Sequence, residues 1–294
     1  MNQIFIYKNE IKEVLEGTDM LFITAGMGGG TGTGASPIVA EIAKSMGILT
    51  VAVVTKPFEF EGALKKNNAD AGIENLKEQV DTLIAIPNDK LFELPNVSIT
   101  LMTAFKEANS VLRVGIKGIS DLITKQGFVN LDFADVKAIM QDSGIAMLGF
   151  GEGSGDGKAK TATEQALNSP LLEKSIEGAQ KVLLNITAGQ DIGLHEIREV
   201  SETVSKKTGS AGATLIWGVI LDPELEGTIK VSLIATDFKE VKDVEKVTSG
   251  MVFTPHEENT AKAGTTLEKS ETAEKATVKN GAETEKKPEN GVEK

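Results

Sequence analysis

The chain has 294 residues, of which 40% are hydrophobic and 25% are charged, which is ordinary for a globular protein long enough for two domains. It has no cysteine, so disulfides and cysteine-based metal sites or nucleophiles are excluded, and His195 and His256 are too few for a histidine metal cluster. The net charge of −12 argues against nucleic acid as a main partner. The start is polar and no apolar run is long enough to span a membrane, so we expect a soluble cytoplasmic protein.

The first third of the chain predicts a parallel α/β sheet. An apolar run over 20–25 predicts a buried strand, and the helix after it should have Pro37 in its first turn and Gly47 as its C-terminal cap. A strand over 48–57, a helix near 63–80 and a strand over 81–89 follow, and this alternation is typical of a parallel sheet. The side of the second helix expected to be buried consists of Leu64, Ala71, Ile73, Leu76 and Val80.

The middle of the chain predicts one long helix and then a second α+β layer. The helix should run from about Thr103 to Lys125, with apolar residues at three- and four-residue steps: Phe105, Ala108, Leu112, Ile116, Ile119 and Ile123. The stretch GIAMLGFGEGSGDG (144–157) predicts a strand followed by a mobile glycine loop. The second layer is expected from a helix over 158–168, a strand over 180–187, a helix over 193–207 and strands over 213–221 and 228–236.

These elements predict four parts. They are a truncated Rossmann-like sheet domain over 1–102, a central helix over 103–127, an α+β domain over 128–238, and a linker with a tail over 239–294. From about residue 255 the sequence has one leucine and no aromatic residue. Such a segment cannot bury enough apolar surface to offset the entropy of ordering, so we expect the tail to be disordered.

The densest glycine cluster, TAGMGGGTGTGASP (24–37), lies between a predicted strand and a predicted helix. Backbone N–H groups in such a loop can face an anion, and the helix dipole adds partial positive charge there, so the cluster indicates phosphate binding. A tight turn without a ligand is the alternative. A P-loop would need a lysine after Gly34, where Ala35 stands, and a nicotinamide dehydrogenase would need an acidic residue where the next strand ends at Lys56. The sequence therefore matches neither the P-loop pattern nor the dinucleotide-binding pattern.

The segment GGGTGTG resembles the signature of the tubulin/FtsZ family of polymerising GTPases. Further segments follow in that family's order: VVTKPFEFEG (53–62), IPND (86–89), NLDFADV (130–136), SPLLE (169–173), GAQKVLLNITAG (178–189) and LDPEL (221–225). The resemblance covers about residues 17–236. It implies a Rossmann-like sheet, a central helix and a second α+β domain.

The resemblance also implies a GTP or GDP site, with Mg²⁺ held mainly through the nucleotide and no metal site made by side chains. The phosphate cradle falls on Gly28, Gly29, Gly30, Thr31, Gly32, Thr33 and Gly34, and further contacts fall on Glu61, Lys65, Asn88, Phe105 and Asn109. In this scheme Glu61 contacts the ribose, Phe105 stacks on guanine and Asn109 reads the guanine edge. Lys65 stands where the family has arginine, which replaces a planar fork by a point charge. As an alternative, Phe105 is simply a core residue of its helix.

The acidic segment 130–136 is implied to complete the site of the next subunit. Asn130, Asp132 and Asp135 would approach the neighbour's γ-phosphate and orient the attacking water, so that hydrolysis requires head-to-tail assembly. A plain helix N-cap is the structural alternative for either aspartate, and it is compatible with the catalytic role. The implied partners are copies of the chain and division-ring regulators, and the implied place is the mid-cell division site in the cytoplasm, with neither nucleic acid nor membrane insertion.

Two departures from the family pattern bear on activity. Family members place three strands and another glycine-rich loop before the position of Thr24, where this sequence has about twenty residues. A fragment or mis-called start, a split gene and a short paralogue are the three explanations. We therefore expect this chain alone not to bind GTP tightly or hydrolyse it, and the alternative function is an assembly or capping partner. We also expect an exposed sheet edge that favours pairing, and the C-terminal PENGVEK lacks the family's usual tether-binding peptide.

Overall fold

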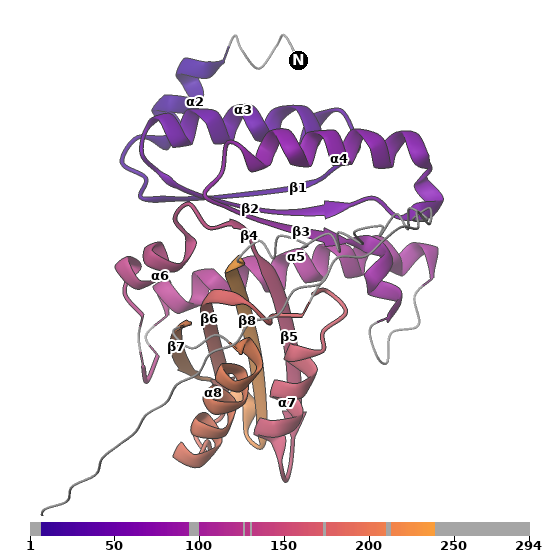
Figure 1. Cartoon of the computed structure of the whole chain (residues 1–294). Coiled ribbons are helices and arrows are strands. Elements are labelled where there is room, and N and C mark those ends of the chain that lie inside the picture. The colour runs from indigo at the N-terminus through magenta and orange to yellow at the C-terminus, as the bar shows by residue number, and fades with distance from the viewer. Residues whose placement is uncertain are drawn as a thin grey trace, which may run out of the picture. The chain divides into compact units, whose positions relative to one another are not determined.

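The computed structural model describes residues 7–93, 100–125, 127–129, 131–172, 175–209 and 213–238. These residues form two four-stranded sheets, each with its own helices (Figure 1). Asn130 and the predicted tail over 239–294 lie outside the described residues. No helix in the described part of the chain combines the length and the apolar character needed to cross a membrane.

The first sheet is wholly parallel, as the sequence predicts. Its order is β1 (Met20–Gly26), β2 (Leu49–Lys56), β3 (Thr82–Pro87) and β4 (Gly144–Ile145). Its helices are α2 (Lys8–Leu15), α3 (Thr31–Ser45) and α4 (Ala63–Lys77), and the short turns η1 (Glu59–Glu61) and η2 (Asn88–Glu93) follow β2 and β3. Almost every residue of β2 is buried, whereas β1 pairs only with β2 and forms the edge among the described strands. Whether that edge favours pairing stays a prediction.

The helix after β1 differs from the prediction at its start. It begins at Thr31, inside the glycine cluster, and Pro37 lies in its interior. The reason is that Gly32 and Gly34 adopt helical backbone here, and the Gly34 N–H already donates to the Gly30 carbonyl at 3.1 Å. The predicted cap is confirmed, since Gly47 takes a φ of +73° directly after the helix, a conformation that favours glycine.

The buried side of α4 is also narrower than predicted. Its buried residues Ala69, Gly72, Ile73 and Leu76 recur at three- and four-residue steps. Leu64 and Ala71 lie off that stripe and are exposed, so their predicted burial is wrong. The exposed leucine stands at the start of α4, close to the glycine cluster in the fold.

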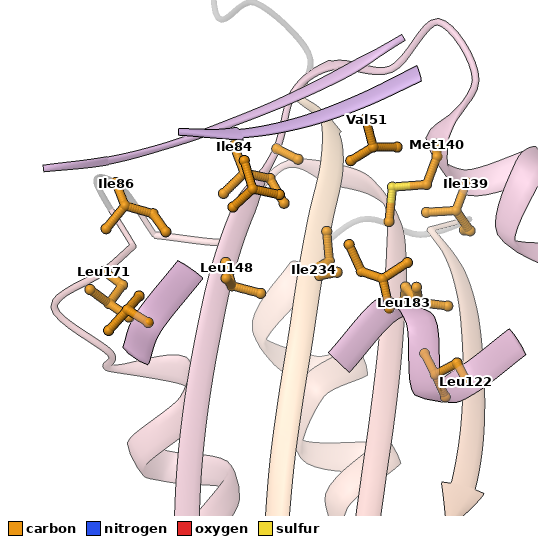
Figure 2. Packing of buried hydrophobic residues seen from close by; sticks show 14 of the residues in the cluster. Val51, Ile84, Ile86, Leu122, Ile139, Met140, Leu148, Leu171, Leu183 and Ile234 are labelled. Atoms are coloured by element: carbon orange, nitrogen blue, oxygen red, sulfur yellow. The ribbon is translucent and has the colours of Figure 1, made fainter. Parts of the chain in front are cut away.

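The long helix α5 (Leu101–Thr124) packs between the two sheets. Its buried side includes Ala104, Ala108, Val111, Ile119 and Leu122. Figure 2 shows Val51 and Ile84 of the first sheet pointing toward Leu148 and Ile234 of the second, with Leu122 in the same cluster. One hydrophobic core therefore joins both sheets through α5, and the division of the chain at 102, 127 and 238 stays a prediction.

The second sheet confirms the predicted α+β layer. Its order is β5 (Met147–Ser154), β8 (Thr228–Phe238), β6 (Ala179–Ala188) and β7 (Thr214–Leu221). Strand β8 is antiparallel to both neighbours, whereas β6 and β7 are parallel. The remaining elements are α6 (Phe133–Met140), α7 (Lys158–Leu167), α8 (Leu194–Thr208) and the turn η3 (Pro223–Leu225).

Three glycines of the predicted strand before α7 have a packing role. Gly149, Gly151 and Gly153 alternate along β5 and so share one face, on which α7 packs. A Cβ at these positions would lie 2.3, 1.9 and 2.1 Å from backbone carbonyl oxygens of α7. The glycines are therefore needed for close approach of helix and strand. The glycine loop predicted after this strand is the turn over 155–157, where Gly155 and Gly157 take positive φ, and its mobility stays a prediction.

One buried cation ties the start of α7 to two loops of the second sheet. The Lys158 side chain is only 8% exposed, and its Nζ donates to Asp191 Oδ2 and lies 3.9 Å from Glu196 Oε1. Asp191 Oδ2 also accepts the Gly227 N–H at 3.2 Å. The hydrogen bond from Lys158 and then that from Gly227 lower the pKa of Asp191.

Substituting Gly151 by alanine should destabilise the fold strongly. The new methyl group would meet the Ala162 carbonyl oxygen at 1.9 Å, which only a shift of α7 can relieve. We expect a loss of about 2–3 kcal/mol in the free energy of unfolding, measured by denaturant titration. Glu152→Ala, on the exposed side of the same strand, is the control and should change stability by less than about 0.5 kcal/mol. Equal stabilities of the two variants would contradict the packing argument.

The stability of the fold should also depend on the ionisation of Asp191. Because its pKa is lower in the folded state, its stabilising contribution is complete above the ordinary aspartate pKa and is lost as pH falls through the folded value. We expect the Tm of the wild type to fall more steeply below about pH 4 than that of Asp191→Asn, which cannot titrate. Parallel Tm curves for the two proteins between pH 7 and pH 3 would refute this linkage.

Candidate functional site

The predicted ligand residues lie where the three long parallel strands end. The register pairs Gly26 with Thr55 and Lys56 with Pro87, so the segments after β1, β2 and β3 leave the sheet at one edge. Backbone contacts connect these segments, because the Met27 N–H donates to the Thr55 carbonyl at 2.9 Å. The loop after β2 is tied to the loop after β3 through Glu59, whose N–H donates to Asp89. Ligands of open α/β sheets bind at this edge.

Two glycines of the cluster are required by the fold. Gly28 is buried with a φ of +101°, and a Cβ there would lie 2.7 Å from the Lys65 carbonyl oxygen. A Cβ on Gly32 would lie 2.6 Å from the Gly26 carbonyl oxygen. These positions therefore need glycine to pack the loop against α4 and the end of β1.

The fold gives no such reason for Gly29, Gly30 and Gly34. None of them has a positive φ, and a Cβ on each would meet no atom of the described part of the chain within 4 Å. Gly29 and Gly30 are exposed and lead directly into Thr31, the exposed first residue of the 15-residue helix α3. The first N–H groups of a helix have no partner within the helix and carry partial positive charge. Open space at glycine positions beside such groups is suited to close approach by an anion.

Glu61 and Lys65 are brought together beside this loop. Glu61 Oε1 accepts the Phe58 N–H at 2.9 Å, and Glu61 Oε2 lies 2.9 Å from Lys65 Nζ. The glutamate side chain is 14% exposed and the lysine 52%, so the pair is reachable from solvent mainly through its cation. Since the Lys65 backbone also packs against Gly28, the carboxylate and the cation lie beside the glycine loop.

Asn88 follows β3 directly and is almost fully buried, with 4% of its surface exposed. Its Oδ1 atom has no hydrogen-bond partner among the described residues. Leaving a buried acceptor unpaired costs free energy, so such an atom at the edge of a sheet indicates a donor supplied by a ligand. A hydroxyl group is such a donor, and a phosphate oxygen is not.

Phe105 is not the simple core residue of the structural alternative. It is 45% exposed and meets Phe58 edge-on, with ring centroids 5.4 Å apart. Phe60 and Phe92 complete the aromatic cluster and are also about half exposed. Asn109 lies one turn further along α5 and is exposed. Sequence reasoning missed Phe58, Phe60 and Phe92, although the FEF segment beside Glu61 and the phenylalanine after IPND were visible.

The acidic segment caps a helix and still has a side chain exposed to solvent. Asp132 Oδ1 accepts the Asp135 N–H at 2.9 Å, which caps α6, so the N-cap interpretation is correct for Asp132. Asp132 is nevertheless exposed and Asp135 is half-buried. The capping bond uses one carboxylate oxygen and leaves the other for a second partner. Asn130, the third member of the predicted group, lies outside the described residues.

The structure keeps this acidic segment apart from the glycine loop. Phe105 and Asn109 lie near the start of α5, whereas Asp132 follows its end, and a helix of 24 residues is about 36 Å long. In Figure 1 the arrowhead of β2 lies at the right of the first sheet and α6 lies at the left. The two halves of the predicted site therefore lie near opposite ends of α5 in the same molecule.

Stability measurements should separate the glycines of the loop into two groups. Gly32→Ala places a methyl group against the Gly26 carbonyl and should lower the free energy of unfolding by about 1–3 kcal/mol. Gly34→Ala meets no atom and lies in a helix, so it should leave stability unchanged or raise it by up to about 1 kcal/mol. Gly30→Ala should behave like Gly34→Ala. A loss as large in Gly30→Ala as in Gly32→Ala would show that the fold, and not a ligand, requires the whole cluster.

Comparison with known proteins gives two family matches and several similar structures. The GTPase domain of the tubulin/FtsZ family matches residues 5–96, and the C-terminal domain of the FtsZ family matches residues 144–239. An empty FtsZ dimer from M. jannaschii is 50% identical, with a TM-score of 0.74 over 78% of this chain and 66% of that chain. The W319Y mutant of M. jannaschii FtsZ is 49% identical, with the same TM-score over 78% of this chain and 68% of that one.

More distant structures share the fold alone. CetZ1 from Haloferax volcanii, as a GDP-bound monomer, is 17% identical, with a TM-score of 0.66 over 82% of this chain and 72% of that chain.

The present chain spans about two thirds of the length of the FtsZ chains that it matches. Both family matches, the identity of about one half and the shared fold agree with the motifs read from the sequence, and the chain belongs to the tubulin/FtsZ family.

Proposed function

We propose that this chain is a GTP-binding cytoskeletal subunit that assembles head to tail, with GTP hydrolysed at the interface between subunits. The observation that carries the proposal is the distance between the two halves of the site. The glycine loop and the aspartates lie at opposite ends of α5, so one chain cannot bring them to the same phosphate. A second copy in the same orientation can place its aspartates beside the phosphates bound by the first copy, because head-to-tail stacking repeats one interface along a filament.

The nucleotide half has a group for each part of GTP. The exposed N–H groups at Gly29, Gly30 and Thr31 suit the phosphates, and Asn88 Oδ1 can accept from a ribose hydroxyl beside Glu61. The exposed face of Phe105 offers a stacking surface for guanine. Asn109, one turn further along α5, can form hydrogen bonds with the edge of the base. Mg²⁺ would be held mainly by the phosphate oxygens and would neutralise their charge during hydrolysis.

The acidic half supplies the group that the nucleotide half lacks. Asp132 keeps one carboxylate oxygen free of its capping bond, and its exposure lets it reach another molecule. A carboxylate there can orient and polarise a water molecule for attack on the γ-phosphate of the neighbouring subunit. Within this proposal the setting is the division ring in the cytoplasm.

A second function would use the acidic segment alone, because Asp132 and Asp135 lie beyond the end of α5 that is far from the glycine loop. On this account the chain does not bind GTP tightly alone and caps filaments of a longer family member by offering Asp132 and Asp135. Titration of the purified chain with GTP separates the two functions, since nanomolar to low micromolar affinity would refute the second. If it does not bind, adding it at equal concentration to M. jannaschii FtsZ should lower light scattering, and unchanged scattering would end the capping idea.

Mixing two inactive variants tests the shared site directly. Gly30→Ala should lose GTP binding while keeping its fold, and Asp132→Asn should keep GTP and the α6 cap, because asparagine is also a good N-cap. Each variant alone should hydrolyse GTP at least about tenfold more slowly than the wild type. In an equal mixture about a quarter of the interfaces pair an Asp132→Asn nucleotide site with an intact Asp132, so phosphate release should recover toward one quarter of the wild-type rate.

The outcome of mixing distinguishes the two site models. A site contained in one chain predicts that the mixture stays as inactive as its components. Asp132→Ala serves as the matched control for the cap, because it removes both the catalytic carboxylate and the N-cap, and should lose about 1 kcal/mol of stability that Asp132→Asn retains. Full hydrolysis by Asp132→Asn alone would remove the aspartate from the mechanism.

A further inference from the structure

The hydroxyl of Thr33 is already engaged within the chain. Thr33 Oγ1 lies 2.8 Å from the backbone nitrogen of Gly28 and accepts its N–H. Gly28 is the buried glycine with a φ of +101°, where the chain leaves β1 and turns toward the exposed Gly29 and Gly30. This hydrogen bond closes a loop of six residues, so the threonine fixes the direction in which the exposed part of the loop points.

A glycine of another helix determines how Thr33 itself is oriented. Gly72 is buried in α4, and a Cβ there would lie 2.3 Å from Thr33 Cγ2 and 3.4 Å from Thr33 Cβ. The missing side chain of Gly72 thus makes the space that the threonine methyl group fills. With its methyl group seated against α4, the threonine turns its hydroxyl toward Gly28.

We propose that Thr33 and Gly72 form a positioning pair that holds the phosphate loop in its binding shape. Thr33 acts through the Gly28 N–H and not as a direct nucleotide ligand, and Gly72 acts through Thr33. This inference rests on the proposed nucleotide function of the loop and assigns a role to a helix α4 residue that lies outside the glycine cluster. A loop already held in shape loses less conformational entropy when it binds, which raises affinity.

The test combines two readouts on three variants. Thr33→Val keeps the branched shape and removes the acceptor, so amide exchange at Gly28, followed by NMR, should become about tenfold faster. Gly72→Ala pushes the threonine methyl group and should have the same effect although it leaves the hydroxyl in place. The double variant Thr33→Ser/Gly72→Ala removes the clashing methyl group and keeps the hydroxyl, so it should restore slow exchange to within about threefold of the wild type.

GTP affinity, measured by titration of the same proteins, should follow the exchange rates. We expect Thr33→Val and Gly72→Ala each to weaken binding about tenfold and the double variant to recover it. Weaker binding in Thr33→Val with unchanged exchange at Gly28 would make Thr33 a direct ligand and overturn the inference. Faster exchange with unchanged affinity, or a double variant without recovery, would overturn it as well.

Two further outcomes keep the test decisive. If Gly72→Ala does not fold, recovery of the fold by adding Thr33→Ser still shows the steric pairing, and Thr33→Val still reports on the loop. If the wild-type chain does not bind GTP, the proposed function fails at that point. The exchange measurements then stand alone, and normal protection of Gly28 in Thr33→Val would refute the hydrogen-bond lock independently of any ligand.

Discussion

The packing of α5 between the two sheets is the interaction on which the arrangement of the molecule depends. Its apolar stripe contributes Ala104, Val111, Ile119 and Leu122 to the core that also contains strands of both sheets. Removing a helix of this length from the core would expose both sheets at once, so the two halves of the chain are stabilised together. The same helix sets how far apart the glycine loop and the acidic segment lie. Core packing therefore fixes the separation on which the proposed sharing of the site between two molecules rests.

Periodicity in the sequence predicted which elements form, because apolar spacing reports directly on burial. The three long parallel strands, the long helix and the second layer were predicted within a few residues, whereas the two-residue strand β4 of the first sheet was not. Periodicity does not report what glycine and proline do at single positions. The sequence predicted a strand here, but not that its Gly149, Gly151 and Gly153 serve close packing of α7 on β5. Pro37 predicted a helix start, although helical glycines before it extend α3 by almost two turns.

The candidate site was predictable only as far as its residue types, and its internal contacts were not. The motif resemblance named Thr33 among the ligands, but nothing in the sequence shows that its hydroxyl is used by Gly28 or that Gly72 lies against its methyl group. Likewise, the pairing of Glu61 with Lys65 follows from their four-residue spacing, whereas the aromatic cluster beside them joins segments far apart in the chain. Contacts between distant segments depend on the fold and cannot be read from local patterns.

Under the proposed function, the loop meets the demands of folding and of ligand binding with the same residue type. Glycines needed for packing have close neighbours at their missing Cβ atoms, and Gly29, Gly30 and Gly34 have none among the described residues. The first kind fixes where the backbone lies, and the second would leave its N–H groups accessible to a phosphate. On that proposal, the glycine loop at one end of α5 and the capped carboxylate at the other are both ordered by the fold before they meet a partner. Assembly would then have to supply only their juxtaposition, because the entropy of ordering the site has already been offset by folding.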